Sequence, residues 1–270
     1  GTNPIDFEPQ QIWRKVRNAA GQWSEPQRVR EQGEVPWELI VRDGKAWMTS
    51  YLGDHYGTNG SAIEVLFHTS DDGLNWEPVD AETPVVYTGG VSEAAFEFDL
   101  TGNLWAVTRN EDGDSTGWGS HLAFAPAGDL GKWQFPSQSN PERYDSPRLF
   151  RHGDDLYMVA RRDIGGPFDM GLTNLTESQK KAVYISSYSL RPKRTALYQI
   201  DQEEEKVVWI MDLPSAGDTS FPSIVRTGPH TYLVANYTSP LTDPNQTWIE
   251  GQVSAAGTQL YLIEINFKAQ

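Results

Sequence analysis

The chain lacks several residue patterns that would identify particular kinds of site. It has no cysteine among 270 residues, which excludes disulfide bonds and thiolate metal centres and leaves the redox compartment open. Its five histidines show no metal-ligand spacing, so no transition-metal site is expected. No apolar run reaches the roughly 18–20 residues of a membrane-spanning helix, so no membrane insertion is expected. Lys and Arg total 22 against 37 Asp and Glu, and the net charge of −15 argues against nucleic acid or an anionic membrane as the main partner.

Aromatic residues, glycine and proline are abundant instead. Ten Trp, eleven Tyr, ten Phe, 24 Gly and 17 Pro are typical of many short strands joined by tight turns. Helical periodicity is almost absent, and the single helix-like stretch, residues 175–182, predicts one or two turns within a surface insertion. The length suits one all-β domain that spans residues 1–270.

Four segments repeat one theme, which is an acidic residue, an apolar strand, a glycine-containing turn and an aromatic-rich strand. They begin at Glu38, Glu93, Asp145 and Asp218, roughly 50–70 residues apart, which is the spacing of four-stranded propeller blades. More polar hairpins lie between them. The sequence therefore predicts an all-β β-propeller with four-stranded antiparallel blades. We expect five blades, with four and six as alternatives.

The N-terminus departs from this repeat. Residues 11–16 and 22–26 form the pattern of an outer hairpin, without an inner pair of strands before it. Either these strands close the ring by pairing with C-terminal strands, or the chain lacks part of an N-terminal blade.

A propeller gathers the starts of its inner strands at one end of the central channel. The four repeated acids are therefore expected to converge there, although they are far apart in sequence. Carboxylates that share a water-poor funnel raise one another's pKa values, which suits acid–base work on glycosidic bonds. The alternative is that each acid forms hydrogen bonds to the backbone of a neighbouring blade.

The stretch from Thr69 to Trp76 has the composition of a stapled turn. Asp71 is expected to accept hydrogen bonds from nearby backbone N–H groups, while Gly73 takes a positive φ and Trp76 folds back as an apolar plug. This pattern resembles the Asp-box, or BNR repeat, of sialidase-like β-propellers, with Asn75 in the usual Thr place. Such a turn lies on the outer rim of a blade, so it indicates fold and not catalysis.

Three further segments are similar to motifs of the sialidase superfamily. Residues 92–109 resemble the stretch that runs from the family's glutamate to the second arginine of its carboxylate-binding triad. Residues 194–198 resemble the stretch that begins with the third arginine, and residues 217–225 resemble the segment with the nucleophilic tyrosine. The resemblance covers about residues 35–267 and is nearest to bacterial sialidase-like proteins of unsettled activity.

This resemblance implies a site for an acidic or deoxy sugar. Arg109 and Arg194 would bind the sugar carboxylate, because guanidinium groups match carboxylates in bidentate geometry. Glu93 would take the proton from a tyrosine nucleophile, and Asp54 would protonate the leaving oxygen. Arg109 could instead pair with an inner-strand acid such as Glu38 or Asp145.

The sequence also departs from the sialidase pattern. Phe221 stands where the nucleophilic tyrosine is expected, and Tyr237 is the candidate substitute. Glu38 lies near the position of the first triad arginine, where it would repel a carboxylate. The pair Arg161-Arg162 could supply the missing cation, and Arg162 is the substrate-binding candidate of the two.

Taken together, the residues favour a glycan-active protein, with exo-acting glycoside hydrolysis at the channel mouth as the leading function. The catalytic candidates are Glu93, Asp54 and Tyr237. The substrate-binding candidates are Arg109, Arg194, Glu38, Asp145, Arg162, Asp218 and Phe221. A non-catalytic propeller that binds carbohydrate or protein, and a structural subunit of an extracellular assembly, are the alternatives. No cofactor is expected, although Asp112-Gly113-Asp114 and Asp154-Asp155 could hold structural calcium. Four glycosylation sequons favour a secreted or periplasmic location, and the start at Gly1 fits either a removed leader or a scar left by a tag.

Overall fold

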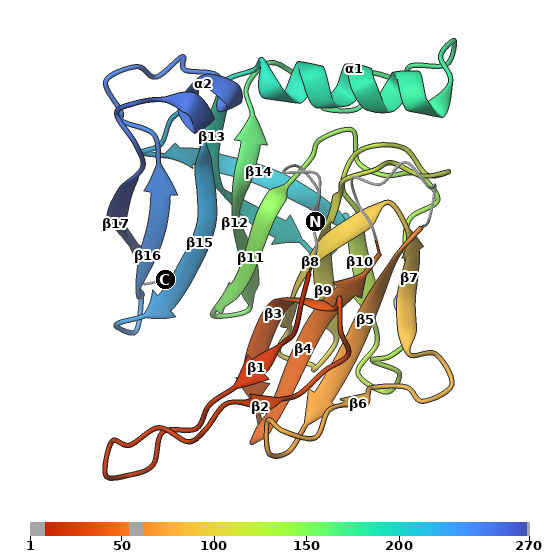
Figure 1. The fold of residues 1–270 in the computed structure, drawn as a ribbon, viewed down its shortest axis with the longest axis vertical. Helices are drawn as coiled ribbons and strands as arrows, with labels where there is room; N and C mark the ends of the chain where they lie inside the picture. The colour runs from red at the N-terminus through yellow and green to blue at the C-terminus, as the bar shows by residue number, and fades with distance from the viewer. Residues whose placement is uncertain (1–8, 54–61, 269–270) are drawn as a thin grey trace.

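The fold is described by a computed structural model for residues 9–53 and 62–268. Almost all of it is antiparallel β-structure, and four sheets are arranged around a common axis (Figure 1). Each sheet begins with one inner strand, and these are β3 (Val35–Arg42), β8 (Val91–Phe98), β11 (Asp145–His152) and β15 (Thr219–Arg226). The predicted all-β propeller of antiparallel sheets is confirmed. Within the described ranges the radial sheets number four, one of the alternatives to five.

The outer strands complete these sheets. The first sheet continues with β4 (Lys45–Leu52), β5 (Ile63–Ser70) and β6 (Glu77–Pro78), while β7 (Val85–Gly89) also pairs with β5. The second sheet adds β9 (Leu104–Asn110) and β10 (Leu122–Ala125). The third adds β12 (Asp155–Asp163), β13 (Lys193–Asp201) and β14 (Lys206–Leu213). The fourth adds β16 (Thr231–Thr238) and β17 (Gln259–Asn266).

Every inner strand has an irregularity near its start. The register of the hydrogen-bonded ladder shifts between Pro36 and Leu39, Val91 and Ala94, Asp145 and Arg148, and Ser220 and Ser223. Such bulges bend a strand and turn its side chains in a new direction. The same local distortion therefore occurs at the start of all four inner strands, where the predicted acids lie.

Aromatic side chains hold successive sheets together. The three interfaces are packed around Phe67, Phe96 and Trp133 between the first and second sheets, Trp105, Tyr144 and Tyr198 between the second and third, and Phe150, Tyr157 and Tyr232 between the third and fourth. Rings of this size bury large apolar areas and pack in tilted or edge-to-face pairs. This packing fixes the positions at which the inner strands meet.

The insertions contain more helix than the composition predicts. Helix α1 (Glu177–Ser189) has 13 residues, not one or two turns, and α2 (Trp248–Val253) was not predicted. A capping box between Thr176 and Gln179 starts α1, and its residues Tyr184 and Tyr188 pack with Phe168. Tertiary packing of this one face stabilises a helix whose own amphipathic pattern is weak. No helix in the described part of the chain is long and apolar enough to cross a membrane.

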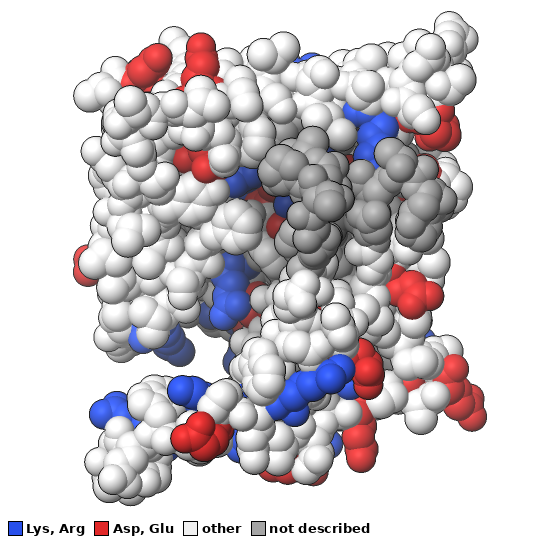
Figure 2. Space-filling model, viewed as in Figure 1, with Lys and Arg blue, Asp and Glu red and all other residues white. Residues whose placement is uncertain are grey.

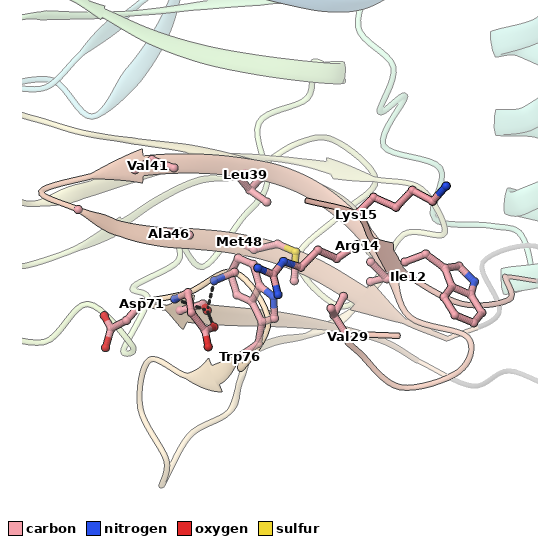
Figure 3. Close-up of a pocket in the computed structure, with 15 residues that line it drawn as sticks. Ile12, Arg14, Lys15, Val29, Leu39, Val41, Ala46, Met48, Asp71 and Trp76 are labelled. Atoms are coloured by element: carbon pink, nitrogen blue, oxygen red, sulfur yellow. Dashed lines mark hydrogen bonds between the residues drawn. The ribbon is translucent and has the colours of Figure 1, made fainter. Parts of the chain in front are cut away.

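The N-terminal strands form a separate ribbon. Strand β1 (Trp13–Arg14) pairs with β2 (Gln27–Arg28), and the predicted pairing with C-terminal strands is not found among the described residues. The ribbon lies over the first sheet, where a cavity of about 540 Å³ separates the two (Figure 3). Ile12 and Val29 line this cavity with Met48 and Trp76.

The stapled turn forms one residue later than predicted. Oδ1 of Asp72, not Asp71, accepts from the backbone N–H groups of Leu74 (2.7 Å) and Asn75 (2.8 Å). Asp71 is exposed and lies 3.6 Å from Lys45. Gly73 has the expected positive φ of +67°. The turn is therefore stapled as expected, but by the second of two adjacent aspartates, and an Asp-box assignment stays a prediction.

Candidate functional site

The starts of the four inner strands meet at one end of the channel, which we call the front mouth. Trp37 Nε1 on β3 donates to the carbonyl oxygen of Pro147 on β11 at 3.3 Å. The backbone N–H of Ser146 on β11 donates to Oε2 of Glu93 on β8 at 2.8 Å. The rings of Trp37 and Phe221 lie 5.7 Å apart and join β3 to β15. Trp37 and Phe221 are more than 180 positions apart in the chain, and the fold brings them together in one site.

Arg109 is at the centre of a buried ion network at this end. Its guanidinium contacts Glu93 (2.7 Å), Glu111 (2.9 Å) and Asp145 (2.8 Å). Arg143 also holds Asp145, at 2.6 Å. The sequence-based alternative that Arg109 pairs with an inner-strand acid such as Asp145 is confirmed. A guanidinium that already binds three carboxylates has no free fork for the carboxylate of a sugar.

Two of the three buried acids of this network, Glu93 and Asp145, have opposite pKa shifts. Burial raises the pKa of Glu93, and the nearby Glu111 and Asp145 add to the effect against Arg109. Burial also acts to raise the pKa of Asp145, but Arg143 and Arg109 together hold it well below its usual range. Asp145 is therefore an ionised structural carboxylate at neutral pH.

Arg161 organises a second group of polar side chains. Its guanidinium donates to the hydroxyl of Tyr237 at 3.0 Å and lies 3.4 Å from Oδ1 of Asp218. The Tyr237 hydroxyl donates to the same Asp218 oxygen at 2.9 Å, and Gln252 donates to Oδ2 at 2.7 Å. Burial raises the pKa of Tyr237 to about 12, so its hydroxyl keeps the proton at neutral pH.

Glu38 lies at the side of a cavity of about 200 Å³ at the front mouth. Its carboxylate is 1% exposed and forms a close ion pair with Arg148, while Oε2 is buried with no hydrogen-bond partner among the described residues. Burial raises the pKa of Glu38 to about 8, although Arg148 opposes the shift. The half-buried Trp37 and the exposed Phe221 also line this cavity. A buried carboxyl group whose pKa is raised thus lies beside aromatic walls.

The front mouth is also where the backbone is strained. Ser146, Ser220 and Phe221 have positive φ angles of 52°, 112° and 55°, which residues other than glycine rarely adopt. All three belong to the bulged starts of β11 and β15. Strain of this kind persists only where surrounding contacts hold it, and it concentrates at functional sites.

The structure does not bring every predicted site residue to this mouth. Arg162 points away from the front mouth, to Asp212 at 3.0 Å and over the ring of Trp209. Arg194 lies opposite Arg162 in the register of β12 and β13, and its Nη1 donates to the carbonyl of Lys193. Asp54 lies outside the described residues.

Two residues of the site, Arg148 and Trp37, were not predicted from the sequence. Arg148, and not Arg162, supplies the cation beside Glu38, while Arg161, the neighbour of Arg162, lies beside Asp218. Successive residues on a strand point to opposite faces, so only a known register could tell Arg161 from Arg162. Trp37, next to Glu38, could have been found from its place directly before a repeated acid.

Two of the acids suggested for calcium, Asp112 and Asp114, already have partners in the protein. Asp114 accepts from the hydroxyls of Tyr87 (2.6 Å) and Thr116 (2.6 Å), and Asp112 lies 2.9 Å from Lys181. In residues 9–53 and 62–268 no group of three His, Asp or Glu side chains could hold a metal ion.

The chain resembles known proteins in structure but not in sequence. No protein-family model and no curated protein sequence matches the chain. An exo-1,5-α-L-arabinanase from a bovine ruminal metagenomic library aligns with a TM-score of 0.51 and 13% identity, over 97% of this chain and 89% of that chain. The chain therefore has a β-propeller fold.

Two other solved structures agree with this assignment. A β-xylosidase/α-arabinofuranosidase from a compost microbial metagenome, in complex with xylotriose, aligns with a TM-score of 0.50 and 11% identity over 97% of this chain and 82% of its own. The β-fructofuranosidase of Bombyx mori aligns with a TM-score of 0.51 and 14% identity over 90% of this chain, which spans about half (51%) of that protein. All three are glycoside hydrolases by name, and at these identities the likeness establishes the fold alone.

Proposed function

We propose that this protein is a glycoside hydrolase that holds one end of a saccharide in the front mouth, with Glu38 as the general acid. The observation that carries the proposal is Glu38 itself, a carboxyl group with a pKa of about 8 beside a cavity of about 200 Å³. A general acid must be protonated at working pH to give its proton to the leaving glycosidic oxygen. The structurally similar hydrolases support a carbohydrate as the ligand.

Asp218 is proposed as the second carboxylate. It is buried and held as a hydrogen-bond acceptor by Tyr237 and Gln252, with Arg161 nearby. The ring of Tyr237 stacks on Phe221 at 5.9 Å, and Phe221 contacts Trp37, so an aromatic wall runs from Asp218 toward Glu38. Sugar rings pack well on such faces. Two carboxylates that flank a sugar are the usual machinery of glycoside hydrolysis.

The sialidase-type mechanism is the finer alternative within this proposal. Tyr237 has a carboxylate and an arginine at its hydroxyl, as a nucleophilic tyrosine would need, but its pKa of about 12 disfavours the phenolate. An acidic sugar would have to place its carboxylate at Arg148, because Arg109 is occupied by three acids. Glu93 and Arg109 are therefore assigned to positioning the mouth.

Hydrolysis of a panel of neutral and acidic aryl glycosides tests the proposal. Glu38→Gln and Asp218→Asn should each lower kcat by at least about 100-fold, the usual contribution of acid–base catalysis. Glu203→Gln, on the exposed turn between β13 and β14, is the matched control. In the wild type kcat should fall above about pH 8, because Glu38 then loses its proton. Full activity in both site variants would place catalysis elsewhere.

A non-catalytic glycan-binding propeller is the second candidate. The observation that favours it is that arginines already neutralise Glu93 and Asp145 at the mouth. In that case a glycan array should give binding without turnover, and Trp37→Ala should weaken it while Glu38→Gln leaves it unchanged. Binding that Trp37→Ala does not alter would contradict this second candidate.

A secreted or periplasmic location fits a glycan substrate and is part of the proposal. The sequons contribute less than their number indicates, because Asn236 is 1% exposed and donates to Thr195 and Thr219. Intact mass measurement of protein from a secreting eukaryotic host would show which of the other sequons carry glycans.

A further inference from the structure

The far end of the central channel contains a second cavity, which we call the rear cavity. It has a volume of about 620 Å³ and is lined where the four inner strands β3, β8, β11 and β15 end. Its charged lining is dominated by four arginines from three of these strands, namely Arg42, Arg148, Arg151 and Arg226. Figure 2 shows Lys and Arg side chains along the hollow at the lower ends of β11 and β15. A concentration of positive charge is unexpected in a chain with a net charge of −15.

The four guanidinium groups differ in how firmly the protein already holds them. Arg148 is paired with the buried Glu38, and Arg226 donates to the carbonyls of Gly228 (3.0 Å) and Pro229 (2.7 Å). Arg42 lies over the ring of Phe98 at 4.5 Å and 3.4 Å from the exposed Asp43. These contacts orient the arginines without satisfying all five N–H donors of each.

Arg151 is the least engaged of the four. Its backbone carbonyl accepts from the Tyr232 hydroxyl at 2.7 Å, which fixes the main chain. Its side chain is exposed, and within the described residues its guanidinium has no hydrogen bond or ion pair. The N–H donors of the Arg151 guanidinium are therefore accessible to a ligand, while a hydrogen bond to Tyr232 holds the Arg151 backbone in place.

Among the described residues that line the cavity, the acids facing these arginines are Asp43 and Glu97. Asp43 is exposed at a turn, so water screens its charge. Glu97 is half-buried, with Oε1 accepting from the Phe98 N–H at 2.8 Å, and burial raises its pKa while Arg151, Arg42 and Arg148 oppose the shift. The cavity thus keeps an excess of positive charge.

We propose that the rear cavity binds a tetrahedral oxyanion, the phosphate or sulfate group of a small ligand, through Arg151 and Arg42. Guanidinium groups approach the cavity from β3, β11 and β15, so donors are available on several sides. An anion with three or more acceptor oxygens can use all of them, whereas a carboxylate is satisfied by one arginine fork. The proposal goes beyond glycoside hydrolysis at the front mouth and does not depend on it.

Calorimetric titration of the protein with inorganic phosphate tests the proposal. We expect binding at millimolar phosphate or below that weakens as sodium chloride rises. Arg151→Gln and Arg42→Gln should each weaken it about 10- to 100-fold, which is the usual worth of a hydrogen bond to a charged group. Arg28→Gln, an exposed arginine on β2, is the matched control and should change nothing. Arg148 is left intact because it also lines the front mouth.

Glu97→Gln is expected to change phosphate affinity in the opposite direction. A gain in affinity cannot result from misfolding, so this variant separates an effect on the site from an effect on folding. It removes the competing carboxylate, so phosphate should bind several-fold more tightly. A titration with glucose 6-phosphate, and with glucose as its neutral partner, distinguishes the source of the anion. Tighter binding of glucose 6-phosphate than of phosphate indicates a phosphorylated sugar, and weaker binding indicates free phosphate. No binding to the wild type, or equal binding by the wild type, Arg151→Gln and Arg42→Gln, would overturn the proposal.

Discussion

The two ends of the central channel are built from the same four inner strands but contain charges in opposite environments. At the front mouth the acids are buried, and Glu93, Asp145 and Asp218 each lie within 3.4 Å of an arginine. In the rear cavity the arginines are in excess and Arg151 is exposed. A buried charge without its partner is costly, whereas an exposed charge is not. The front arginines are therefore part of the structure, whereas Arg151 at the rear is available for a ligand.

The backbone differs between the two ends in the same way. Ser146, Ser220 and Phe221 are strained at the front mouth, while among the described non-glycine residues that line the rear cavity only Asp43 has a positive φ, in an exposed turn. Strain at the front aims side chains into the channel, and the packed aromatic interfaces behind it hold the strain in place. At the rear end the inner strands end with regular backbone geometry, without comparable strain.

The largest expected difference between the two ends concerns Arg109. Arg109→Met should lower the free energy of unfolding by about 3–5 kcal/mol, because it leaves Glu93, Glu111 and Asp145 close together without their shared cation. Urea denaturation followed by tryptophan fluorescence measures this. Arg28→Met on the ribbon is the control. A loss of unfolding free energy below about 1 kcal/mol would mean that Glu93, Glu111 and Asp145 repel one another only weakly without Arg109.

A smaller effect is expected from the titration of Glu38. Its pKa of about 8 in the folded state, against 4.5 as the ordinary value, means that the folded protein binds the proton more tightly than the unfolded chain. Stability should therefore fall as pH rises from about 4.5 to 8. In Glu38→Gln this fall should shrink by more than about 1.4 kcal/mol, the worth of one pKa unit. Urea denaturation at several pH values compares the two proteins, and parallel curves would contradict the assigned pKa.

Glu34 gives the opposite pH dependence to Glu38 in the same urea series. Burial acts to raise its pKa, but bonds from His68, Arg30 and Ser50 hold it at about 2. Its contribution to stability is present above pH 4.5 and is lost as pH falls toward 2. Glu34→Gln should therefore destabilise the protein at neutral pH and lessen the loss of stability in acid.

The strain at the front mouth predicts a smaller, stabilising change. Ser146→Gly should raise the free energy of unfolding by about 0.5 kcal/mol, since glycine adopts the positive φ freely and the buried Ser146 Oγ has no partner among the described residues. Ser223→Gly, on β15 with ordinary backbone geometry, is the matched control and should destabilise by about 0.5–1 kcal/mol. Thermal unfolding of both variants provides the measurement. Equal losses would show that Ser146 is not strained.

The smallest effect on stability is expected in the rear cavity. Arg151→Gln should change the free energy of unfolding by less than about 0.5 kcal/mol, as is usual for an exposed side chain without a partner. The same urea series measures it. A loss as large as that of Arg109→Met would remove the distinction between the two ends.

The repeat of acid, strand, glycine turn and aromatic strand predicted the fold from the sequence, because inward and outward positions alternate on every strand. The same repeat predicted that Glu38, Glu93, Asp145 and Asp218 approach one channel end. It could not predict which partner each acid receives. Arg161 and Arg162 are adjacent and chemically identical, and so are Asp71 and Asp72, so their roles depend on register and turn geometry.

The amino-acid sequence by itself determined the strand pattern, the absence of cysteine thiols, and the place of the acids at the strand starts. Only the tertiary structure decided that Arg109 contacts Glu93, Glu111 and Asp145 together, that Arg148 reaches Glu38, and that four arginines line a second cavity. The reason is physical. Periodicity along a strand fixes which face a side chain occupies, but pKa values and ion pairs depend on burial and on groups brought from other sheets.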